Sequence, residues 1–162
     1  MIYYKLYITH MNASAVGKNY SEVELAYASD FIDADGAIMA CIEKHNEKRF
    51  GFRVRVILKV SQKEIMIIKW FLKTFKVGNI RKNNQIYDWQ IQNQIDCLRM
   101  LKIFLPYIKV KKKQAGIAVR ILEKSVKDKK DLMYIANLGD TLSRFNVRSK
   151  NRRKNFASMI QK

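Results

Sequence analysis

The sequence predicts a single α+β domain whose elements follow the order α-β-β-α-β-β-α, with extra helices after the last strand. Three observations carry this prediction. A helix start signal opens residues 21–36, alternation of apolar and polar residues follows directly, and a very apolar helical segment separates two such alternating stretches. At 162 residues the chain suits one domain, which we expect at 21–145, between an N-terminal arm (1–20) and a basic C-terminal tail (146–162).

The first helix is expected at residues 21–36. Ser21, followed three residues later by Glu24, is a capping-box signature. Apolar residues then recur at helical spacing, and small side chains crowd one side of the helix: Ala26, Ala28 and Ser29. Small side chains allow close approach, so this face favours contact with a second helix.

The same helix ends in two acids, Asp33 and Asp35, followed by Gly36. Glycine permits a left-handed residue that terminates a helix, so both carboxylates are expected at the helix foot. Negative charge at the negative end of a helix dipole is disfavoured by up to about 1 kcal/mol. A cation close to these carboxylates is therefore expected.

Residues 37–60 are predicted to form a β-hairpin that turns at 45–48. In the first strand Ile38, Ala40 and Ile42 alternate with Ala37, Met39, Cys41 and Glu43. In the second strand one face is apolar (Phe50, Phe52, Val54, Val56, Leu58, Val60) and the other is basic (Arg49, Arg53, Arg55, Lys59). Like charges side by side on a strand repel, so the basic face indicates an anion lying across it. A nucleic-acid face is favoured over a solvated polar face, which would more often mix acids with bases.

A helix is predicted at 62–75, and a second hairpin follows it with a turn at Asn83-Asn84. The helix keeps one apolar stripe: Ile65, Ile68, Leu72 and Phe75. On the hairpin, Tyr87, Trp89 and Ile91 alternate with an exposed polar set of Asp88, Gln90 and Gln92, which shares its chemistry with Asn79 and Arg81. Such side chains hydrogen-bond base edges in the major groove. A strand advances about 3.3 Å per residue, close to the roughly 3.4 Å between successive bases, so a four-stranded antiparallel saddle matches a run of base pairs.

Three helices are expected after the second hairpin. The first is capped by Asn93 and ends near Pro106, with a stripe of Ile95, Leu98, Leu101 and Leu105. The second turns Ala115, Ala118, Ile121 and Leu122 inward, and the third carries Leu132, Ile135, Leu138 and Leu142. Past Phe145 the chain becomes basic, which fits a solvated tail and phosphate contact equally well.

The charge balance predicts a polyanionic partner. Lys and Arg total 32 against 14 Asp and Glu, a formal net charge of +18. Nucleic acid and an anionic membrane are the two candidates; no apolar run reaches the about 18 residues that a transmembrane helix needs, so no segment is expected to span a bilayer. Cys41 and Cys97 lack metal-type spacing and are expected as free thiols in a reducing compartment.

Residues 28–36 read ASDFIDADG, and this stretch resembles the motif that names the LAGLIDADG homing endonucleases, with a good match over its last six positions. The first three positions differ, and Asp30 stands where the family's helix faces a partner helix. The resemblance continues at 60–63 (VSQK) and at 106–115 (PYIKVKKKQA). It implies a curved antiparallel DNA-binding sheet and a metal-dependent, site-specific double-strand DNA endonuclease.

The resemblance also implies the catalytic residues. Asp35 takes the place of the metal ligand, with the Ala34 carbonyl as a weaker second contact and Asp33 as support for the helix foot. Gln62 takes the place of the polar residue that helps to hold the metal-bound water network. Mg²⁺ is the expected cofactor, with Mn²⁺ or Ca²⁺ as substitutes, because it needs few carboxylates beside water and substrate oxygens.

Two basic positions complete the comparison with the family. Lys111 takes the place of the active-site lysine, with Lys109 or Lys113 as the alternative bearer. The family often has another basic residue one turn after the glutamine, where this chain has Met66. One active-site cation is therefore left unassigned.

The resemblance further implies that a chain with a single motif works as a homodimer, which pairs the 21–36 helices, binds a long near-palindromic site and leaves 3′ overhangs. The side chains expected to contact duplex DNA are Met39, Cys41, Glu43, His45, Arg49, Arg53, Arg55, Ile57, Lys59, Arg81, Asn83, Asp88, Gln90, Lys112 and Lys113. Dimerisation doubles the formal charge, so binding is expected to weaken steeply with salt.

Other readings use the same scaffold. An RNA-binding intron maturase and a non-cleaving DNA-binding protein are the alternatives. A membrane-surface protein is the least favoured, because the basic residues lie on strand faces and not along an amphipathic helix. Abundant Ile, Lys and Asn are typical of the A·T-rich organellar introns that often house this family, so a mitochondrial or chloroplast location is expected.

Overall fold

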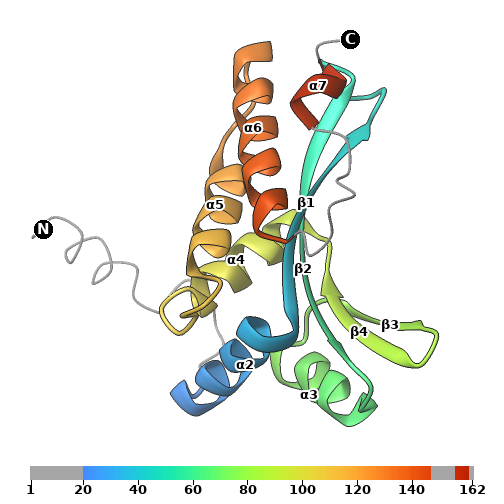
Figure 1. Ribbon diagram of the computed structural model, residues 1–162, viewed down its shortest axis with the longest axis vertical. Coiled ribbons are helices and arrows are strands. Elements are labelled where there is room, and N and C mark those ends of the chain that lie inside the picture. Colours follow the sequence, from blue (N-terminus) through green and yellow to red (C-terminus); the bar gives the residue numbers. More distant parts are fainter. Residues whose placement is uncertain (1–19, 147–155, 161–162) are drawn as a thin grey trace, which may run out of the picture.

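The computed structural model describes residues 20–146 and 156–160, and this part of the chain contains a four-stranded antiparallel sheet with helices packed against it (Figure 1). The strands are β1 (Gly36–Lys44), β2 (Phe52–Gln62), β3 (Asn79–Asn83) and β4 (Ile86–Ile91). The helices are α2 (Glu22–Asp35), α3 (Ile65–Phe75), α4 (Gln94–Phe104), α5 (Lys112–Glu123), α6 (Lys129–Phe145) and α7 (Phe156–Ile160). The predicted α+β class and element order are confirmed. Of the predicted N-terminal arm, only Tyr20 is among the described residues.

The sheet has the order β1-β2-β4-β3, and each neighbouring pair is antiparallel. β1 and β2 form a long hairpin, whereas β4 pairs only with the last part of β2, from Leu58 to Gln62. At Val56, beyond the part of β2 that pairs with β4, the side chain of Gln94 bonds to the strand backbone. Its Oε1 accepts the Val56 N–H at 2.8 Å and its Nε2 donates to the Val56 carbonyl at 2.9 Å. One side-chain amide thus satisfies the strand edge where β4 has ended.

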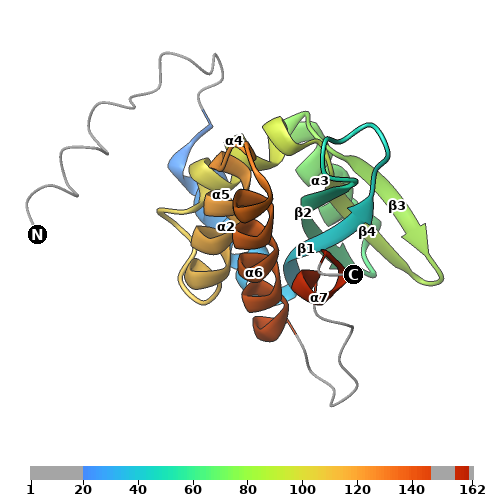
Figure 2. The ribbon, with the colours of Figure 1, turned by 90° about the horizontal axis from the view of Figure 1, so that it is seen from above.

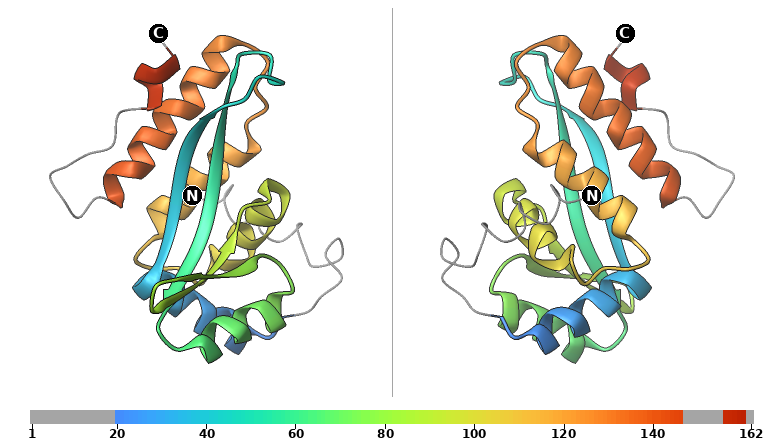
Figure 3. Two further views of the ribbon diagram at one scale, coloured as in Figure 1. Left: turned by 90° about the vertical axis from the view of Figure 1, so that its right-hand side faces the viewer. Right: turned by 90° about the vertical axis from the view of Figure 1, so that its left-hand side faces the viewer.

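The core lies between the sheet and the helices. Helices α4, α5 and α6 lie on one side of the β1–β2 hairpin, and α2 and α3 lie together at one end of it (Figures 2 and 3). The inward strand residues Val56, Leu58 and Val60 are fully buried. Trp89 of β4 packs its ring 4.8 Å from that of Phe71 on α3 and donates its indole N–H to the Val77 carbonyl at 2.9 Å. These contacts fix which face of the sheet stays outside the core.

Helix α2 begins with the predicted capping box. The Ser21 hydroxyl accepts the Glu24 N–H at 3.2 Å, and the Glu24 carboxylate accepts the Ser21 N–H at 3.0 Å. The small side chains expected at a helix contact are divided between two environments. Ala28 and Ser29 are fully buried within the chain, whereas Ala26 is exposed.

Gly36 joins α2 to β1, but the predicted left-handed termination is wrong. Its φ is −82° and its ψ is 161°, which is extended backbone. A Cβ at this position would lie 2.5 Å from the carbonyl oxygen of Ile32. Close approach of the helix backbone, and not a positive φ, is therefore what requires glycine here.

Three predicted boundaries differ from the structure. β2 continues through Gln62, so α3 begins at Ile65 and not at residue 62. Asn83 pairs with Ile86, so the β3–β4 turn is Asn84-Gln85, one residue later than predicted, and Asn84 has the positive φ of 54°. The β1–β2 turn extends to Gly51, which leaves Arg49 and Phe50 in the turn and outside the strand.

The predicted stripe of α4 is partly wrong. Asn93 caps the helix as expected, but Ile95, predicted to point inward, is 80 % exposed. The buried residues of α4 are Cys97, Met100, Leu101 and Phe104. Both cysteines are free thiols, as predicted, and burial raises the pKa of Cys97 to about 12.

Helix α7 belongs to the predicted basic tail. The Ala157 N–H donates to the Asp140 carboxylate of α6 at 3.2 Å, and Ile160 is 5 % exposed. This part of the tail therefore packs against α6, while 147–155 and 161–162 lie outside the described residues. None of the described helices is long and apolar enough to cross a bilayer.

Candidate functional site

Asp35 and Gln62 meet at the foot of α2. Asp35 is the last residue of α2, and Gln62 is the last residue of β2. Because β1 and β2 are antiparallel and Gly36 pairs with Val60, the start of β1 lies beside the end of β2. The Gln62 Nε2 donates to Asp35 Oδ2 at 2.6 Å. Two residues assigned from separate motifs are thus in direct contact.

Lys111 reaches the same helix end from the segment before α5. Its ammonium donates to the carbonyl oxygens of Ile32 at 3.0 Å and of Asp33, and lies 3.5 Å from that of Ala34. The last carbonyls of a helix have no partners within the helix, and a cation there is favoured by the dipole. Lys111 is therefore the counter-cation that the acids at the helix foot predicted.

Asp33 holds the Lys111 segment in place. One carboxylate oxygen accepts the N–H groups of Lys109 at 2.7 Å and Val110 at 3.0 Å, and the other accepts that of Lys111 at 2.9 Å. Asp33 supports the helix foot, as expected, but it does so by binding a loop 76 to 78 residues away. No local pattern in the sequence signals this pairing.

The residues at the helix foot fit a divalent cation of the magnesium type. Asp35 and Ala34 are exposed, and the described residues contain no cluster of three or more His, Cys, Asp or Glu side chains that would form an all-protein metal cage. Mg²⁺ keeps several water ligands and binds through one or two carboxylates plus phosphate oxygens. Asp35 is an exposed carboxylate of this kind. The Ala34 carbonyl, predicted as the weaker contact, lies 3.5 Å from the Lys111 ammonium.

The basic residue that the family often has one turn after the glutamine is replaced by Met66 in this chain. Met66 of α3 is 67 % exposed, so its thioether lies in solvent and not in the core. Lys63, which follows Gln62 directly, and Lys69, one turn after Met66, are both exposed. Neither donates a hydrogen bond to a described residue.

The strand register places most of the predicted DNA-contacting side chains on the sheet face away from the helices. That set is Met39, Cys41, Glu43, Arg53, Arg55, Ile57, Lys59, Arg81, Asn83, Asp88 and Gln90. Met39 stands opposite Ile57, and Lys59 stands opposite Gln90. β3 and β4 bend away from the long axis of the β1–β2 hairpin (Figure 1), which makes the face curved.

The face is less uniformly basic than the sequence predicted, because two acids on neighbouring strands pair with its cations. Glu43 accepts hydrogen bonds from Arg53 at 2.7 Å and lies 2.6 Å from Arg55. The hydrogen bond from Arg53, together with the charge of Arg55, holds the pKa of the Glu43 carboxyl below its ordinary value.

Asp88 and Gln90 were predicted to be exposed, and this is wrong: they are 6 % and 8 % exposed. β4 is an inner strand between β2 and β3, so side chains on both sides cover its residues. Asp88 accepts a hydrogen bond from the Ser61 hydroxyl at 2.6 Å and lies 3.4 Å from the Lys59 ammonium. Its carboxylate is thus already bonded within the protein.

The remaining predicted contacts lie off the sheet face. His45 and Arg49 are in the β1–β2 turn, and Lys112 and Lys113 are exposed in the first turn of α5. Arg49 was predicted on the basic strand face, and this is wrong. Its Nη1 donates to the Lys127 carbonyl at 3.3 Å, and its guanidinium lies 5.4 Å from the ring centre of Phe50.

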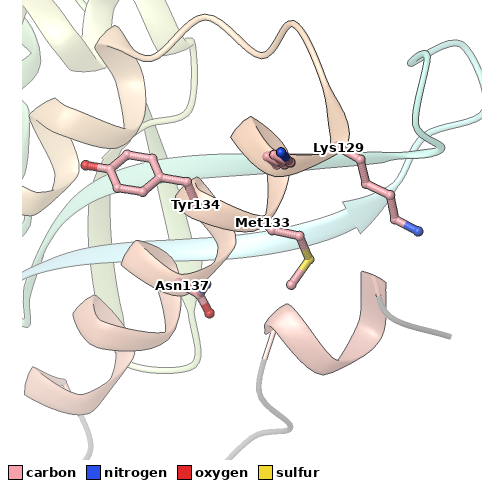
Figure 4. Close-up of a pocket in the computed structure, with 5 residues that line it drawn as sticks. Lys129, Met133, Tyr134 and Asn137 are labelled. Carbon is pink, nitrogen blue, oxygen red and sulfur yellow. The ribbon is translucent and has the colours of Figure 1, made fainter.

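A surface hollow of about 610 Å³ lies along the first turns of α6 (Figure 4). It is lined by Lys129, Lys130, Met133, Tyr134 and Asn137. This end of α6 is at the top of Figure 1 and α2 is at the bottom, so the hollow is remote from the helix foot that carries Asp35. It does not belong to the candidate active site.

Comparisons with known proteins agree with this geometry. The family model described as LAGLIDADG endonuclease matches residues 29–118. DNA endonuclease I-CreI of Chlamydomonas reinhardtii is 28 % identical over 108 residues, which cover 64 % of this chain and 65 % of that protein. DNA endonuclease I-CvuI of Chlorella vulgaris is 29 % identical over 126 residues, which cover 75 % of this chain and 78 % of that protein.

Solved structures give the same result. I-CvuI bound to the I-CreI target in the presence of Mg has a TM-score of 0.77 at 28 % identity, covering 86 % of this chain and 91 % of that chain. The archaeal endonuclease I-Vdi141I with DNA has a TM-score of 0.74 at 17 % identity, covering 86 % and 96 %, and this likeness is one of fold alone. Because the family model covers more than half of the sequence, the chain belongs to the LAGLIDADG endonuclease family.

Proposed function

We propose that this chain is a site-specific DNA endonuclease that hydrolyses one phosphodiester in each strand of a duplex with the help of a divalent metal ion. The observation that carries the proposal is the contact between Asp35 and Gln62 beside the Lys111 ammonium, in a member of this family. The similar endonuclease I-CvuI has been seen with its DNA target in the presence of Ca, and with the I-CreI target in the presence of Mg, where the DNA was not cleaved. Both complexes support a duplex DNA ligand, and the divalent ion and the cleavage step remain part of the proposal.

Each residue at the helix foot has a separate task. Asp35 would hold the ion, with the Ala34 carbonyl as a second contact, and Gln62 orients the Asp35 carboxylate through its 2.6 Å hydrogen bond. Lys111, whose ammonium donates to the Ile32 carbonyl at 3.0 Å, would stabilise the negative charge of the scissile phosphate. A divalent ion held by a carboxylate activates water, stabilises charge on phosphorus and assists the leaving oxygen. Mg²⁺ is the ion we propose, with Mn²⁺ or Ca²⁺ as substitutes.

We also propose that two chains pair through α2. The exposed side of this helix carries Val23 (78 % exposed), Ala26, Tyr27 (43 % exposed), Asp30 and Ala34, which recur at helical spacing and are mostly apolar or small. An exposed apolar stripe on a helix is typical of a partner surface. Twofold pairing would bring two Asp35 carboxylates to one duplex, so that each chain would cut one strand of a long, near-palindromic site. The 3′ overhangs that we expect follow from the family resemblance.

The curved sheet face supplies the contacts to DNA. Residues along its strands are about 3.3 Å apart, close to the roughly 3.4 Å between successive bases. Its basic side chains, Arg53, Arg55 and Lys59, lie on the side of the sheet away from α4, α5 and α6. The chain's formal charge of +18 adds sequence-independent attraction to phosphates, which salt weakens.

Cleavage of a selected target tests this function. Target duplexes are selected from a randomised library, cloned into a plasmid and incubated with the protein and Mg²⁺. We expect cuts in both strands with 3′ overhangs, and we expect Asp35→Asn to bind the same duplex without cutting it. A parent protein that binds the site but leaves it intact in Mg²⁺ and Mn²⁺ contradicts the endonuclease proposal.

A second candidate is a non-cleaving DNA-binding protein on the same scaffold. It is favoured by Met66, which stands exposed where the family often has a basic residue. An RNA-binding maturase is the other alternative on this scaffold. Binding to the host intron RNA, but not to duplex DNA, in the same assay identifies the maturase, whereas duplex binding without cutting identifies the non-cleaving protein.

A further inference from the structure

Three side chains on the curved sheet face form one ion-pair network. Glu43 of β1 stands opposite Arg53 of β2 in the strand register, and Arg55 lies two residues further along β2. One Glu43 carboxylate oxygen lies 2.7 Å from Arg53 Nη2, and the other lies 2.6 Å from Arg55 Nη2. The three side chains are 24 % to 35 % exposed, so each is partly covered and partly open to a ligand. A single carboxylate thus holds two guanidinium groups.

The network leaves hydrogen-bond donors of both arginines unused. An arginine has five N–H donors in a rigid fork. Glu43 engages only Nη2 of each, and neither Nη1 donates to any residue that the structure describes. The Nε atoms of both are buried and without an acceptor in that part of the chain. The outer ends of the guanidinium groups are therefore the parts that remain for a ligand.

The spacing of the two arginines matches the spacing of base pairs. Residues two apart on a strand point to the same face and are separated by about 6.6 Å along it. Base pairs two steps apart are separated by roughly 6.8 Å. Arginine held with its fork toward the major groove pairs with O6 and N7 of guanine, which is the commonest specific contact of this kind.

We propose that Glu43 is a specificity-determining residue, which holds Arg53 and Arg55 so that they contact guanines two base pairs apart in each half-site. The inference rests on the proposed site-specific DNA binding. A free arginine loses much rotamer entropy when it binds and is equally able to reach a phosphate. Glu43 removes part of that freedom beforehand and cancels one positive charge, so it lowers general attraction to phosphates and favours base contacts.

Selection from randomised duplexes tests the proposal with matched variants. Glu43→Gln removes the carboxylate, and Glu47→Gln makes the same charge change in the exposed β1–β2 turn, away from any ion pair in the described residues. For the wild type we expect guanine at two positions two base pairs apart in each half-site. Glu43→Gln is expected to lower that preference about tenfold, the size of one good base contact, whereas Glu47→Gln keeps it.

The outcomes separate the inference from the proposed function. A Glu43→Gln protein that keeps the guanine preference, or a wild type that prefers other bases at these positions, overturns the inference. A wild type that keeps the preference but does not cut in Mg²⁺ leaves the inference standing and contradicts the endonuclease. A wild type that enriches no sequence overturns both.

A measurement on the DNA-free protein tests the network itself. The Glu43 carboxyl carbon is followed by NMR during an acid titration, in the wild type and in Arg53→Gln and Arg55→Gln. We expect the wild-type carboxyl to titrate below the ordinary value of 4.5, and each substitution to move it upward. Titration at the ordinary value in the wild type shows that the arginines are not held, and the inference is then overturned.

Discussion

Asp33 and Lys111 are bonded in both directions. The Asp33 carboxylate accepts the Lys111 backbone N–H at 2.9 Å, and the Lys111 ammonium donates to the Asp33 carbonyl oxygen. The same carboxylate also holds the N–H groups of Lys109 and Val110. The position of the Lys111 ammonium, which we propose for the active site, therefore depends on Asp33, whose carboxylate is bonded to three backbone N–H groups.

Asp33→Asn is expected to slow cleavage while leaving DNA affinity unchanged. An amide has one acceptor oxygen in place of two, so at least one of the three N–H groups loses its partner. We expect a loss of stability of about 1–3 kcal/mol and a fall in the single-turnover rate of about a hundredfold, the cost of a small misplacement at an active site. Glu47→Gln, which removes an exposed acid in the β1–β2 turn that has no ion pair among the described residues, is the control. A full cleavage rate in Asp33→Asn contradicts the positioning role.

Lys111→Met distinguishes the predicted lysine from its neighbour. Of Lys109 and Lys111, Lys111 donates its ammonium to the last carbonyls of α2, whereas the Lys109 side chain is exposed. We expect Lys111→Met to lower the cleavage rate about 10² to 10³-fold, as loss of one charge-stabilising donor does. Lys109→Met is expected to lower the affinity for DNA. At saturating protein its cleavage rate should equal that of the wild type. Equal rate losses in both variants, measured at saturating protein, contradict the assignment.

Gly36→Ala is expected to destabilise the fold, whereas Gly116→Ala is not. The new Cβ at position 36 would lie 2.5 Å from the Ile32 carbonyl oxygen, but one at position 116 meets nothing within 4 Å. Overpacking typically costs 1–3 kcal/mol, so we expect a loss of about that size at position 36. In α5 the replacement of glycine by alanine favours the helix by up to about 1 kcal/mol. Urea unfolding of the two variants measures both effects.

Acid is expected to remove the stabilisation that Glu43 provides. Its pKa is lowered in the folded protein, so its contribution is fully present above the ordinary value of 4.5 and is lost as the pH falls through the folded value. The ion pairs of Glu43 with Arg53 and Arg55 are partly exposed, so they contribute about 1 kcal/mol or less to the free energy of unfolding. The free energy of unfolding of Glu43→Gln should approach that of the wild type as the pH is lowered through this window. A difference between the two that does not change with pH contradicts the pairing.

Tyr27→Asp is expected to abolish the proposed dimer. Tyr27 is 43 % exposed on the α2 stripe, which already carries Asp30. A further carboxylate at position 27 adds like-charge repulsion across the twofold contact and removes the apolar ring from it. Tyr134→Asp is the control for a new surface carboxylate, because Tyr134 is 46 % exposed on α6. The Tyr27 ring also packs 5.0 Å from that of Phe31 and 4.9 Å from that of Trp70, so urea unfolding must show that Tyr27→Asp is still folded. Sedimentation should give a dimer for the wild type and Tyr134→Asp, and a monomer for Tyr27→Asp. A wild type that sediments as a monomer, also with target DNA, contradicts the dimer proposal.

Short-range signals allowed much of the fold to be predicted. The capping box of Ser21 and Glu24 and the cap at Asn93 involve residues within three positions of each other, so their hydrogen bonds depend on local backbone alone. The alternation in β2 and the burial of Trp89 follow from the pleat of a strand that has one side in the core. The resemblance at 28–36 pointed to Asp35 for the same reason, since the motif is contiguous.

The tertiary structure decided what depends on pairing between distant segments. Register placed Glu43 opposite Arg53, and the position of β4 inside the sheet buried Asp88, neither of which the alternation of either strand alone reveals. The bonds from Asp33 to the segment at 109–111 join residues 76 to 78 positions apart. Residue type and spacing determined which chemistry the chain carries, and the packing of sheet and helices determined which of those groups meet, because a hydrogen bond or ion pair forms only between groups that the fold brings within about 3 Å of each other.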